Sequence, residues 1–258
     1  MSKATSNVIW YEILTRDLDA ALKFYRAVLG WTVRPSGTPG MDYRFLVLGD
    51  DPIGGAMQIP PAAAANGMRP AWLMYFNVAD VDVTVASIVA AGGAVHMPAT
   101  DIPGTGRVAM VADPQGAAFY VMTPIGERVS SSFRPNAPGH GGWHELHTTD
   151  WKSALKFYSQ NFGWSTVLEM DMGPLGTYLQ FNTGAGAAIG GMMNDADAPK
   201  PYWLIVFNTD DVDAALRRLK AAHGEPVRGP MQVPGGDWVV VARDPQGAVF
   251  AVVGPRKS

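Results

Sequence analysis

An internal repeat restricts what this chain can fold into more than any other feature of its sequence. Trp10–Ile13 (Trp-Tyr-Glu-Ile) returns as Trp143–Leu146 (Trp-His-Glu-Leu), 133 residues later. Asp113–Gly116 (Asp-Pro-Gln-Gly) returns unchanged as Asp244–Gly247, 131 residues later. Ordered landmarks at a nearly constant offset indicate one domain in tandem.

The length of 258 residues allows each copy a core of its own. The sequence predicts a first domain at residues 1–123, a linker at 124–140 and a second domain at 141–258. The linker is predicted because this stretch is rich in proline, glycine and serine and has no apolar period. A structured strap across the first domain is the alternative.

Charge and composition exclude several classes of function. The formal net charge of −3 gives no reason to expect nucleic acid or an anionic membrane as a partner. The absence of cysteine excludes disulfides, thiolate metal sites and cysteine nucleophiles. The polar start at 1–7 has no apolar stretch behind it, and no run reaches the roughly 20 apolar residues of a membrane helix. We therefore expect a cytoplasmic protein and leave its oligomeric state open.

The order of elements within each half is itself a repeat. Val8–Leu14 has the β-branched and aromatic composition of a strand. A helix with apolar residues at helical spacing is expected to begin after Asp17 and to end at Gly30, and three strand-like runs follow it. The same order returns in each quarter of the chain. The predicted fold class is α+β, with four βαβββ units.

Four such units resemble the vicinal oxygen chelate superfamily of glyoxalases, bleomycin-resistance proteins and extradiol dioxygenases. The specific marks are the helix segment Asp17–Tyr25 with its copy from Asp150, and the two Asp-Pro-Gln-Gly turns. The resemblance covers residues 8–123 and 141–254. It implies two half-open β-barrels, each a cup built from two units, with helices outside and the site inside. Pairing of the first unit with the second and of the third with the fourth is expected, and pairing across the chain stays open.

The resemblance also implies a divalent metal held by His, Gln or Glu on the first and last strands. The matching positions hold Trp10, Leu73 and Tyr120 in the first half, and Trp143, Leu204 and Ala251 in the second. None of these is a usual ligand for such an ion, and a single phenol does not make a site. We therefore expect no metal at the standard position and no cofactor.

Carboxylates on the first strand of each half are the candidate catalytic groups. Strand alternation places Glu12 on the face of Trp10, and Glu145 on the face of Trp143 together with His147. A carboxylate in an apolar cup is costly unless it is paired. Glu12, Glu145 and His147 are therefore candidates for anchoring a ligand or for acid–base chemistry. The alternative is a structural carboxylate bonded to a backbone amide or, in the first half, to Arg44 or Arg107; His144 is expected to face the helix.

Aromatic residues are abundant where a pocket is expected, and flat rings suit planar or apolar small molecules. The candidate ligand-binding residues are Trp10, Trp72, Tyr75, Tyr120, Trp143, Tyr178, Trp203 and Trp238. The alternative is that these rings simply fill two barrels.

Three functions follow. The first is a metal-free member of the superfamily that binds a small aromatic or amphipathic molecule for sequestration or sensing. The second is a glyoxalase- or hydroxylase-type enzyme that uses Glu12, Glu145 and His147. The third is an interaction protein whose cups are closed by tryptophan. The absent ligands and the abundant aromatic residues place the first ahead.

Overall fold

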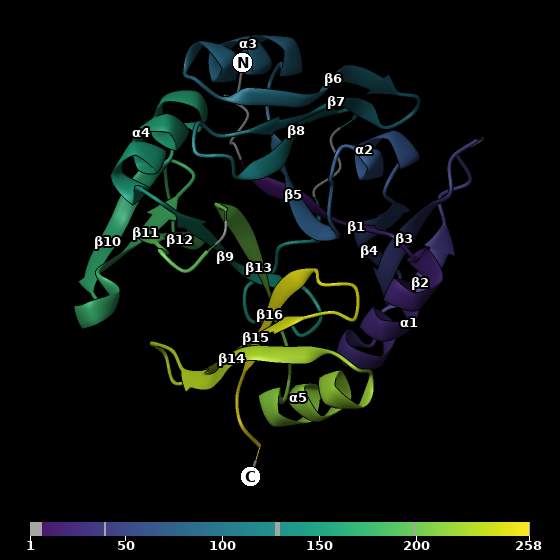
Figure 1. The fold of residues 1–258 in the computed structure, drawn as a ribbon, viewed down its shortest axis with the longest axis vertical. Coiled ribbons are helices and arrows are strands. Elements are labelled where there is room, and N and C mark those ends of the chain that lie inside the picture. Colours follow the sequence, from purple (N-terminus) through teal and green to yellow (C-terminus); the bar gives the residue numbers. More distant parts are fainter. Residues whose placement is uncertain (1–6, 39, 127–129, 199, 258) are drawn as a thin grey trace. The chain divides into compact units, whose positions relative to one another are not determined.

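The structure is a computed structural model that describes residues 7–38, 40–126, 130–198 and 200–257 (Figure 1). Residues 1–6, which belong to the segment predicted not to be a signal peptide, lie outside the described residues. So do residues 127–129 of the predicted linker. No helix in the described ranges is long and apolar enough to cross a bilayer.

Four βαβββ repeats follow one another along the chain. The first contains β1 (Val8–Thr15), α1 (Leu18–Leu29), β2 (Thr32–Pro35), β3 (Tyr43–Leu48) and β4 (Asp51–Gln58). The second contains β5 (Ala71–Asn77), α3 (Val81–Ala90), β6 (Ala94–Ile102), β7 (Gly106–Ala112) and β8 (Ala118–Pro124). The third contains β9 (Gly141–Thr148), α4 (Trp151–Phe162), β10 (Ser165–Asp171), β11 (Thr177–Asn182) and β12 (Gly190–Asn194). The fourth contains β13 (Tyr202–Asn208), α5 (Val212–Ala221), β14 (Glu225–Gln232), β15 (Trp238–Arg243) and β16 (Val249–Gly254).

The strands form two eight-stranded sheets of equivalent topology. One has the order β2-β3-β4-β1-β5-β8-β7-β6 and the other β10-β11-β12-β9-β13-β16-β15-β14. Within each repeat the first strand pairs in parallel with the last, as β1 does with β4 and β9 with β12, and the other pairings are antiparallel. The predicted α+β class with four βαβββ units is confirmed. The short helix α2 (Pro61–Ala65) and the 3-10 turn η1 (Gly173–Leu175) were not predicted.

Local sequence sets the ends of the first helix in each half. Asp17 caps α1 by accepting a hydrogen bond from the backbone N–H of Ala20, and Asp150 caps α4 in the same way. Gly30 and Gly163 end the two helices in the left-handed conformation, with φ of 77° and 71°. The predicted start and end of these helices are confirmed.

Contacts divide the chain into two compact units that join repeats from opposite halves. Unit 1 comprises Met1–Ile9, Met74–Val129 and Trp143–Leu204, and therefore holds most of the second and third repeats. Unit 2 comprises Trp10–Leu73, Ser130–Gly142 and Ile205–Ser258, and holds most of the first and fourth. The sheets follow the expected pairing of successive repeats, whereas the compact units cross it. The domain boundaries at residues 123 and 141 remain a prediction.

In unit 2, the second Asp-Pro-Gln-Gly turn packs on the start of α1. The hydroxyl of Tyr25 on α1 donates to Asp244 Oδ2 at 3.0 Å and accepts from Trp72 Nε1 at 2.8 Å. Gln246 Oε1 accepts from the backbone N–H of Asp17, and Gln246 Nε2 donates to the Asp17 carbonyl. The motif that sequence analysis treated as a turn therefore also holds a helix from the other end of the chain. Helix α5 lies against β14, β15 and β16 in the same unit (Figure 1).

Unit 1 contains the same arrangement built from the other two repeats. The hydroxyl of Tyr158 on α4 donates to Asp113 Oδ2 at 3.1 Å and accepts from Trp203 Nε1 at 3.1 Å. Gln115 binds the backbone N–H and carbonyl of Asp150, as Gln246 does for Asp17. Burial raises the pKa of Asp113 and raises that of the Tyr158 phenol well above its ordinary value. The phenol therefore remains a hydrogen-bond donor at neutral pH.

Residues 130–140 of the predicted linker form a strap, a segment with fixed partners in unit 2, whereas Pro124 ends β8. Phe133 pairs with Gly141 in an isolated parallel bridge. The carbonyl of Gly139 accepts from Trp31 Nε1 at 2.8 Å, and the side chain of Asn208 donates to the carbonyl of Arg134.

Candidate functional site

Three polar or aromatic side chains of β9 lie on one face of the third repeat. Trp143, Glu145 and His147 alternate with His144 and Leu146, so they share the face opposite to the buried pair. Glu145 pairs in register with Gly191, and His147 with Met193, on the neighbouring strand β12. All of these residues belong to unit 1.

Tyr178 on β11 links the first two of these side chains. Its hydroxyl accepts from Trp143 Nε1 at 2.7 Å and donates to Glu145 Oε1 at 2.8 Å. Burial, together with the Glu145 carboxylate beside it, raises the pKa of the Tyr178 phenol well above its ordinary value. Tyr178 therefore stays protonated and fixes one oxygen of Glu145.

Gly191 makes room for this bridge. A Cβ on Gly191 would lie 2.1 Å from the Tyr178 ring, because the ring folds over the strand at this point. A Cβ on the neighbouring Gly190 would collide with the His144 carbonyl and the Phe181 ring. The glycine pair thus allows close packing of a ring and of backbone.

His147 is held from two sides. Its Nδ1 lies 2.8 Å from Asp195 Oδ2, and its ring stacks on Tyr202 with centroids 4.7 Å apart and an interplanar angle of 6°. Asp195 is itself fixed, because its other oxygen accepts from the backbone N–H groups of Asp197 and Ala198. An ionised Asp195 accepts only, so it selects the tautomer of His147 that carries its proton on Nδ1.

The second ring nitrogen of His147 has its hydrogen-bonding capacity unused. Nε2 is buried and has no hydrogen-bond partner among the described residues. Glu145 Oε2 lies 3.5 Å from it, and the Glu145 side chain is 24% exposed whereas that of His147 is 5% exposed. In the neutral tautomer both atoms present lone pairs to the same space. A proton, or a ligand that offers an N–H or O–H, would satisfy both.

The first half carries only part of this arrangement. Trp10 Nε1 donates to the Tyr43 hydroxyl at 2.8 Å, and the Tyr43 ring folds over Gly55, the register partner of Glu12. Glu12 is 2% exposed. The positions that correspond to His147, Asp195 and Tyr202 hold Leu14, Ile59 and Ala71, which have no polar side-chain atom.

The two arginines considered as partners for Glu12 pair with other carboxylates. Arg44 binds Asp19 and Asp42, and Arg107 binds Asp82 and Asp101. All four aspartates are well exposed, and these ion pairs raise the pKa of both guanidinium groups further above their ordinary values. These ion pairs therefore place both guanidinium groups among surface carboxylates.

Trp72 and Trp203, both predicted to contact a ligand, lie in the aromatic cores of their units. Each donates its indole N–H to a helix tyrosine, Tyr25 or Tyr158, and each is less than 5% exposed. Alternation explains the placement, because Leu73 and Leu204 follow directly and point to the opposite faces. These contacts account for both tryptophans without a ligand.

The remaining predicted rings lie in different surroundings. Tyr75 and Tyr120 are register partners on β5 and β8 and stack on each other at 4.3 Å, both buried. Trp238 is half-buried in unit 2, with the Arg256 guanidinium 4.2 Å above its ring.

His144 lies on the opposite face of β9, as expected. It is fully buried, and its Nδ1 pairs with the Ile189 carbonyl at 2.8 Å. Burial lowers the pKa of His144 to about 4, so the ring is neutral near pH 7. His140 is also buried and pairs with the Ser131 carbonyl, whereas His96 and His223 are exposed.

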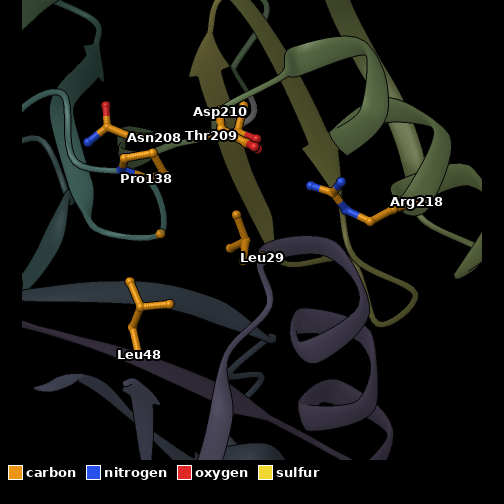
Figure 2. Close-up of a pocket in the computed structure, with 8 residues that line it drawn as sticks. Leu29, Leu48, Pro138, Asn208, Thr209, Asp210 and Arg218 are labelled. Atoms are coloured by element: carbon orange, nitrogen blue, oxygen red, sulfur yellow. The ribbon is translucent and has the colours of Figure 1, made fainter. Parts of the chain in front are cut away.

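One small cavity of about 110 Å³ lies in unit 2, away from all the predicted site residues. Figure 2 shows its lining, to which Leu29 of α1, Leu48 of β3, Pro138 of the strap and Arg218 of α5 contribute. Arg218 uses its Nε to bond the Val28 carbonyl, and Asp210 pairs with Lys257. These contacts give the two charged side chains of the cavity, Arg218 and Asp210, a structural role.

The side chains at the family's metal positions do not fit a divalent cation. Trp143 Nε1 is engaged as a donor to Tyr178, and Leu204 and Ala251 are fully buried apolar residues. In the first half Trp10 donates to Tyr43, and Leu73 has no ligating atom. Across the described ranges, no group of three or more His, Asp or Glu residues is arranged to hold a metal ion.

Sequence analysis named Trp143, Glu145, His147 and Tyr178, which the structure brings together, but it did not name Asp195 and Tyr202. Asp195 directly follows β12, and the register of β12 against β9 brings it to His147. A signal was present for Tyr202, because the repeat aligns Pro201-Tyr202-Trp203 with Pro70-Ala71-Trp72 and so marks it as a difference between the halves.

Comparison with known proteins gives one family and relatives of similar length. The profile described as Glyoxalase/Bleomycin resistance protein/Dioxygenase superfamily matches residues 7–121 and 142–252. A Mycobacterium tuberculosis protein named "Putative glyoxylase CFP32" is 34% identical over 249 residues, which covers 95% of this chain and 94% of that protein. The anthracycline biosynthesis protein DauV of Streptomyces sp. is 30% identical over 268 residues, covering 96% and 93%.

A solved structure shares the fold at much lower identity. The Mn(II)-bound glyoxalase from Novosphingobium aromaticivorans matches with a TM-score of 0.66 and 18% identity, over 100% of this chain and 84% of that one. At this identity the likeness concerns the arrangement of strands and helices, which agrees with the βαβββ repeats described above.

Proposed function

Because the chain belongs to the Glyoxalase/Bleomycin resistance protein/Dioxygenase superfamily, we propose that it binds a small aromatic or amphipathic molecule beside Glu145 and His147. The binding needs no metal at the family's usual positions. The observation that carries this proposal is the buried Nε2 of His147, which has no hydrogen-bond partner in the part of the chain that the structure describes and lies 3.5 Å from the partly exposed Glu145. A buried polar group without a partner costs roughly 1–3 kcal/mol, which a ligand would recover.

Aromatic rings around this pair support a planar ligand. Trp143, Tyr178 and Tyr202 are each partly exposed. Tyr178 bonds Glu145, Tyr202 stacks on His147, and Trp143 is linked to Glu145 through Tyr178. Such rings provide a large contact area at low entropic cost. The similarity to a protein of anthracycline biosynthesis supports the same class, because anthracyclines are planar polycyclic aromatics.

Direct titration tests this proposal. The purified chain, treated with EDTA, is titrated with 9-anthracenemethanol and with the anthracycline doxorubicin, and binding is followed by probe fluorescence. We expect saturable 1:1 binding of at least one probe, weakened about tenfold or more by His147→Leu, which copies Leu14 of the first half. The matched change on the other side of the strand, Leu146→Met, is expected to leave affinity unchanged. Absence of binding by both probes, or equal binding by His147→Leu, overturns the proposal.

The hydrogen bond between His147 Nδ1 and Asp195 favours a second candidate, an enzyme of glyoxalase type that acts by proton transfer. A histidine oriented by a carboxylate can take a proton through Nε2 and return it. In this role Glu145 would hold the substrate, and Asp195 would position the ring. Glu12 has no such histidine beside it on β1, where Leu14 takes the place of His147.

An activity assay separates the two candidates. The EDTA-treated chain is incubated with the hemithioacetal of methylglyoxal and glutathione, and metal content is measured on the same sample. Turnover that falls at least a hundredfold in His147→Asn would establish the enzyme. Turnover that appears only with added metal, or that His147→Asn leaves unchanged, would exclude proton transfer by this residue.

A further inference from the structure

We infer that the ligand of the Glu145–His147 site carries a positively charged amine next to its aromatic body. This inference rests on the proposed function and specifies the class of molecule. It follows from the charges and hydrogen-bonding atoms that surround one buried atom, the Nε2 of His147.

Two atoms that can accept hydrogen bonds, His147 Nε2 and Glu145 Oε2, face each other in this site. In the tautomer that carries its proton on Nδ1, where Asp195 accepts it, Nε2 of His147 presents a lone pair. Glu145 Oε1 already accepts from Tyr178, and its Oε2 faces Nε2 at 3.5 Å. Two facing acceptors gain from a donor placed between them, and an ammonium group has three N–H donors and a compact charge.

The cluster formed by Glu145, His147 and Asp195 contains two carboxylates, so its charge favours a cationic ligand. Glu145 and Asp195 contribute two carboxylates, which lie against Tyr178, backbone N–H groups and the His147 ring. Tyr178 adds no compensating charge, because its raised pKa keeps it neutral. The side chain of Glu145 is the more exposed of the two carboxylates, at 24% against 12% for Asp195, so it is the carboxylate that a ligand amine reaches first.

The rings near the pair suit the same class of ligand. Tyr202 lies flat against His147, Tyr178 donates to Glu145, and Trp143 donates to Tyr178. The faces of tyrosine and tryptophan rings attract cations as well as aromatic surfaces. A carboxylate among partly exposed rings therefore favours an aromatic amine over an aromatic acid of the same shape.

A series of probes that differ only in charge tests the inference. The EDTA-treated full chain is titrated at pH 7.5 with 9-(aminomethyl)anthracene, 9-anthracenemethanol and 9-anthracenecarboxylate, which share one tricyclic body. We expect the ammonium to bind at least tenfold more tightly than the alcohol, and the carboxylate most weakly. Glu145→Gln should bring the ammonium to the affinity of the alcohol.

A surface carboxylate of the same unit gives the control for net charge. Glu169→Gln on β10 removes an equal charge from an exposed position, and it should keep the order of the three probes. Equal affinities for all three, or tightest binding of the carboxylate, would overturn the inference and leave the proposed binding function standing. Failure of all three probes to bind would overturn the proposed function together with the inference.

Discussion

The first strands of the two halves begin alike and end differently. β1 and β9 both carry Trp-x-Glu, and in both a tyrosine from the third strand of the repeat folds over a glycine and accepts a bond from the tryptophan. Beyond the glutamate, β9 continues to His147, which Asp195 and Tyr202 hold in place, whereas β1 continues to Leu14. Glu12 is 2% exposed, and Glu145 is partly exposed. The same scaffold thus carries a histidine beside the glutamate in one half and a leucine in the other.

The comparison also separates structure from function within one motif. Both halves keep the Trp–Tyr hydrogen bond, so this bond alone does not distinguish a binding site. The second half adds a buried imidazole whose Nε2 has no hydrogen-bond partner among the described residues. His147, Asp195 and Tyr202 are therefore the residues that distinguish the two halves on this face.

The largest predicted difference between the halves is in the pH dependence of stability. His144 has a pKa of about 4 in the folded chain, against an ordinary value of 6.5. The unfolded chain therefore binds this proton more readily, and the stability present above pH 6.5 is lost as the pH falls toward 4. The loss amounts to about 3 kcal/mol by the linkage relation. Tyr11, which occupies the matching position of the first half, does not titrate in this range.

Urea unfolding at pH 7.5, 6, 5 and 4.5 measures this loss, with His144→Gln as the comparison. The variant lacks the titrating ring and should show a shallower decline below pH 6.5 than the original chain. Parallel declines in the two proteins would mean that His144 is not the group responsible.

Two matched substitutions in the cores test where the halves are alike, because both should lose a similar amount of unfolding free energy. Tyr25→Phe and Tyr158→Phe each remove the bond to a buried aspartate and leave a tryptophan N–H without its acceptor. Each should lower the free energy of unfolding by about 2 kcal/mol. Denaturant titration of both variants measures these losses. No loss of unfolding free energy in one variant and a loss of more than about 2 kcal/mol in the other would contradict the likeness of the two cores.

The smallest effect concerns the two glutamines of the Asp-Pro-Gln-Gly turns. Gln115→Ala and Gln246→Ala each remove side-chain bonds to the start of a helix, at Asp150 and Asp17. These bonds are exposed, so a loss of about 1 kcal/mol is expected in each case. Thermal unfolding of both variants beside Gln180→Ala gives the measurement. A stabilising effect in either turn would contradict the role assigned to these side chains.

The repeat allowed the sequence to predict the fold in detail, because capping aspartates, ending glycines and the final turns recur in order. The capping of α1 by Asp17 and its end at Gly30 are confirmed, and the three strands predicted after this helix are observed. The two compact units were not foreseen. They depend on packing between residues such as Tyr25 and Asp244, which lie 219 positions apart and share no local pattern.

The site was partly predictable for a similar reason. Alternation along a single strand placed Glu145 and His147 on one face, since that relation is local. Asp195 lies 48 positions after His147 in the sequence. It was missed because its approach to His147 depends on the register between β9 and β12. Trp72 was predicted to contact a ligand, and the neighbouring Leu73 was placed at a metal position inside the same cup. These two predictions conflict, because consecutive residues of a strand point to opposite faces.

A structure of the chain with 9-(aminomethyl)anthracene bound would test the central claim most directly. The account predicts electron density for the amine between Glu145 and His147, with the aromatic body against Trp143, Tyr178 or Tyr202, and no density for the probe beside Glu12. Density beside Glu12 alone, or a metal ion seated at Trp143, Leu204 and Ala251, would contradict it.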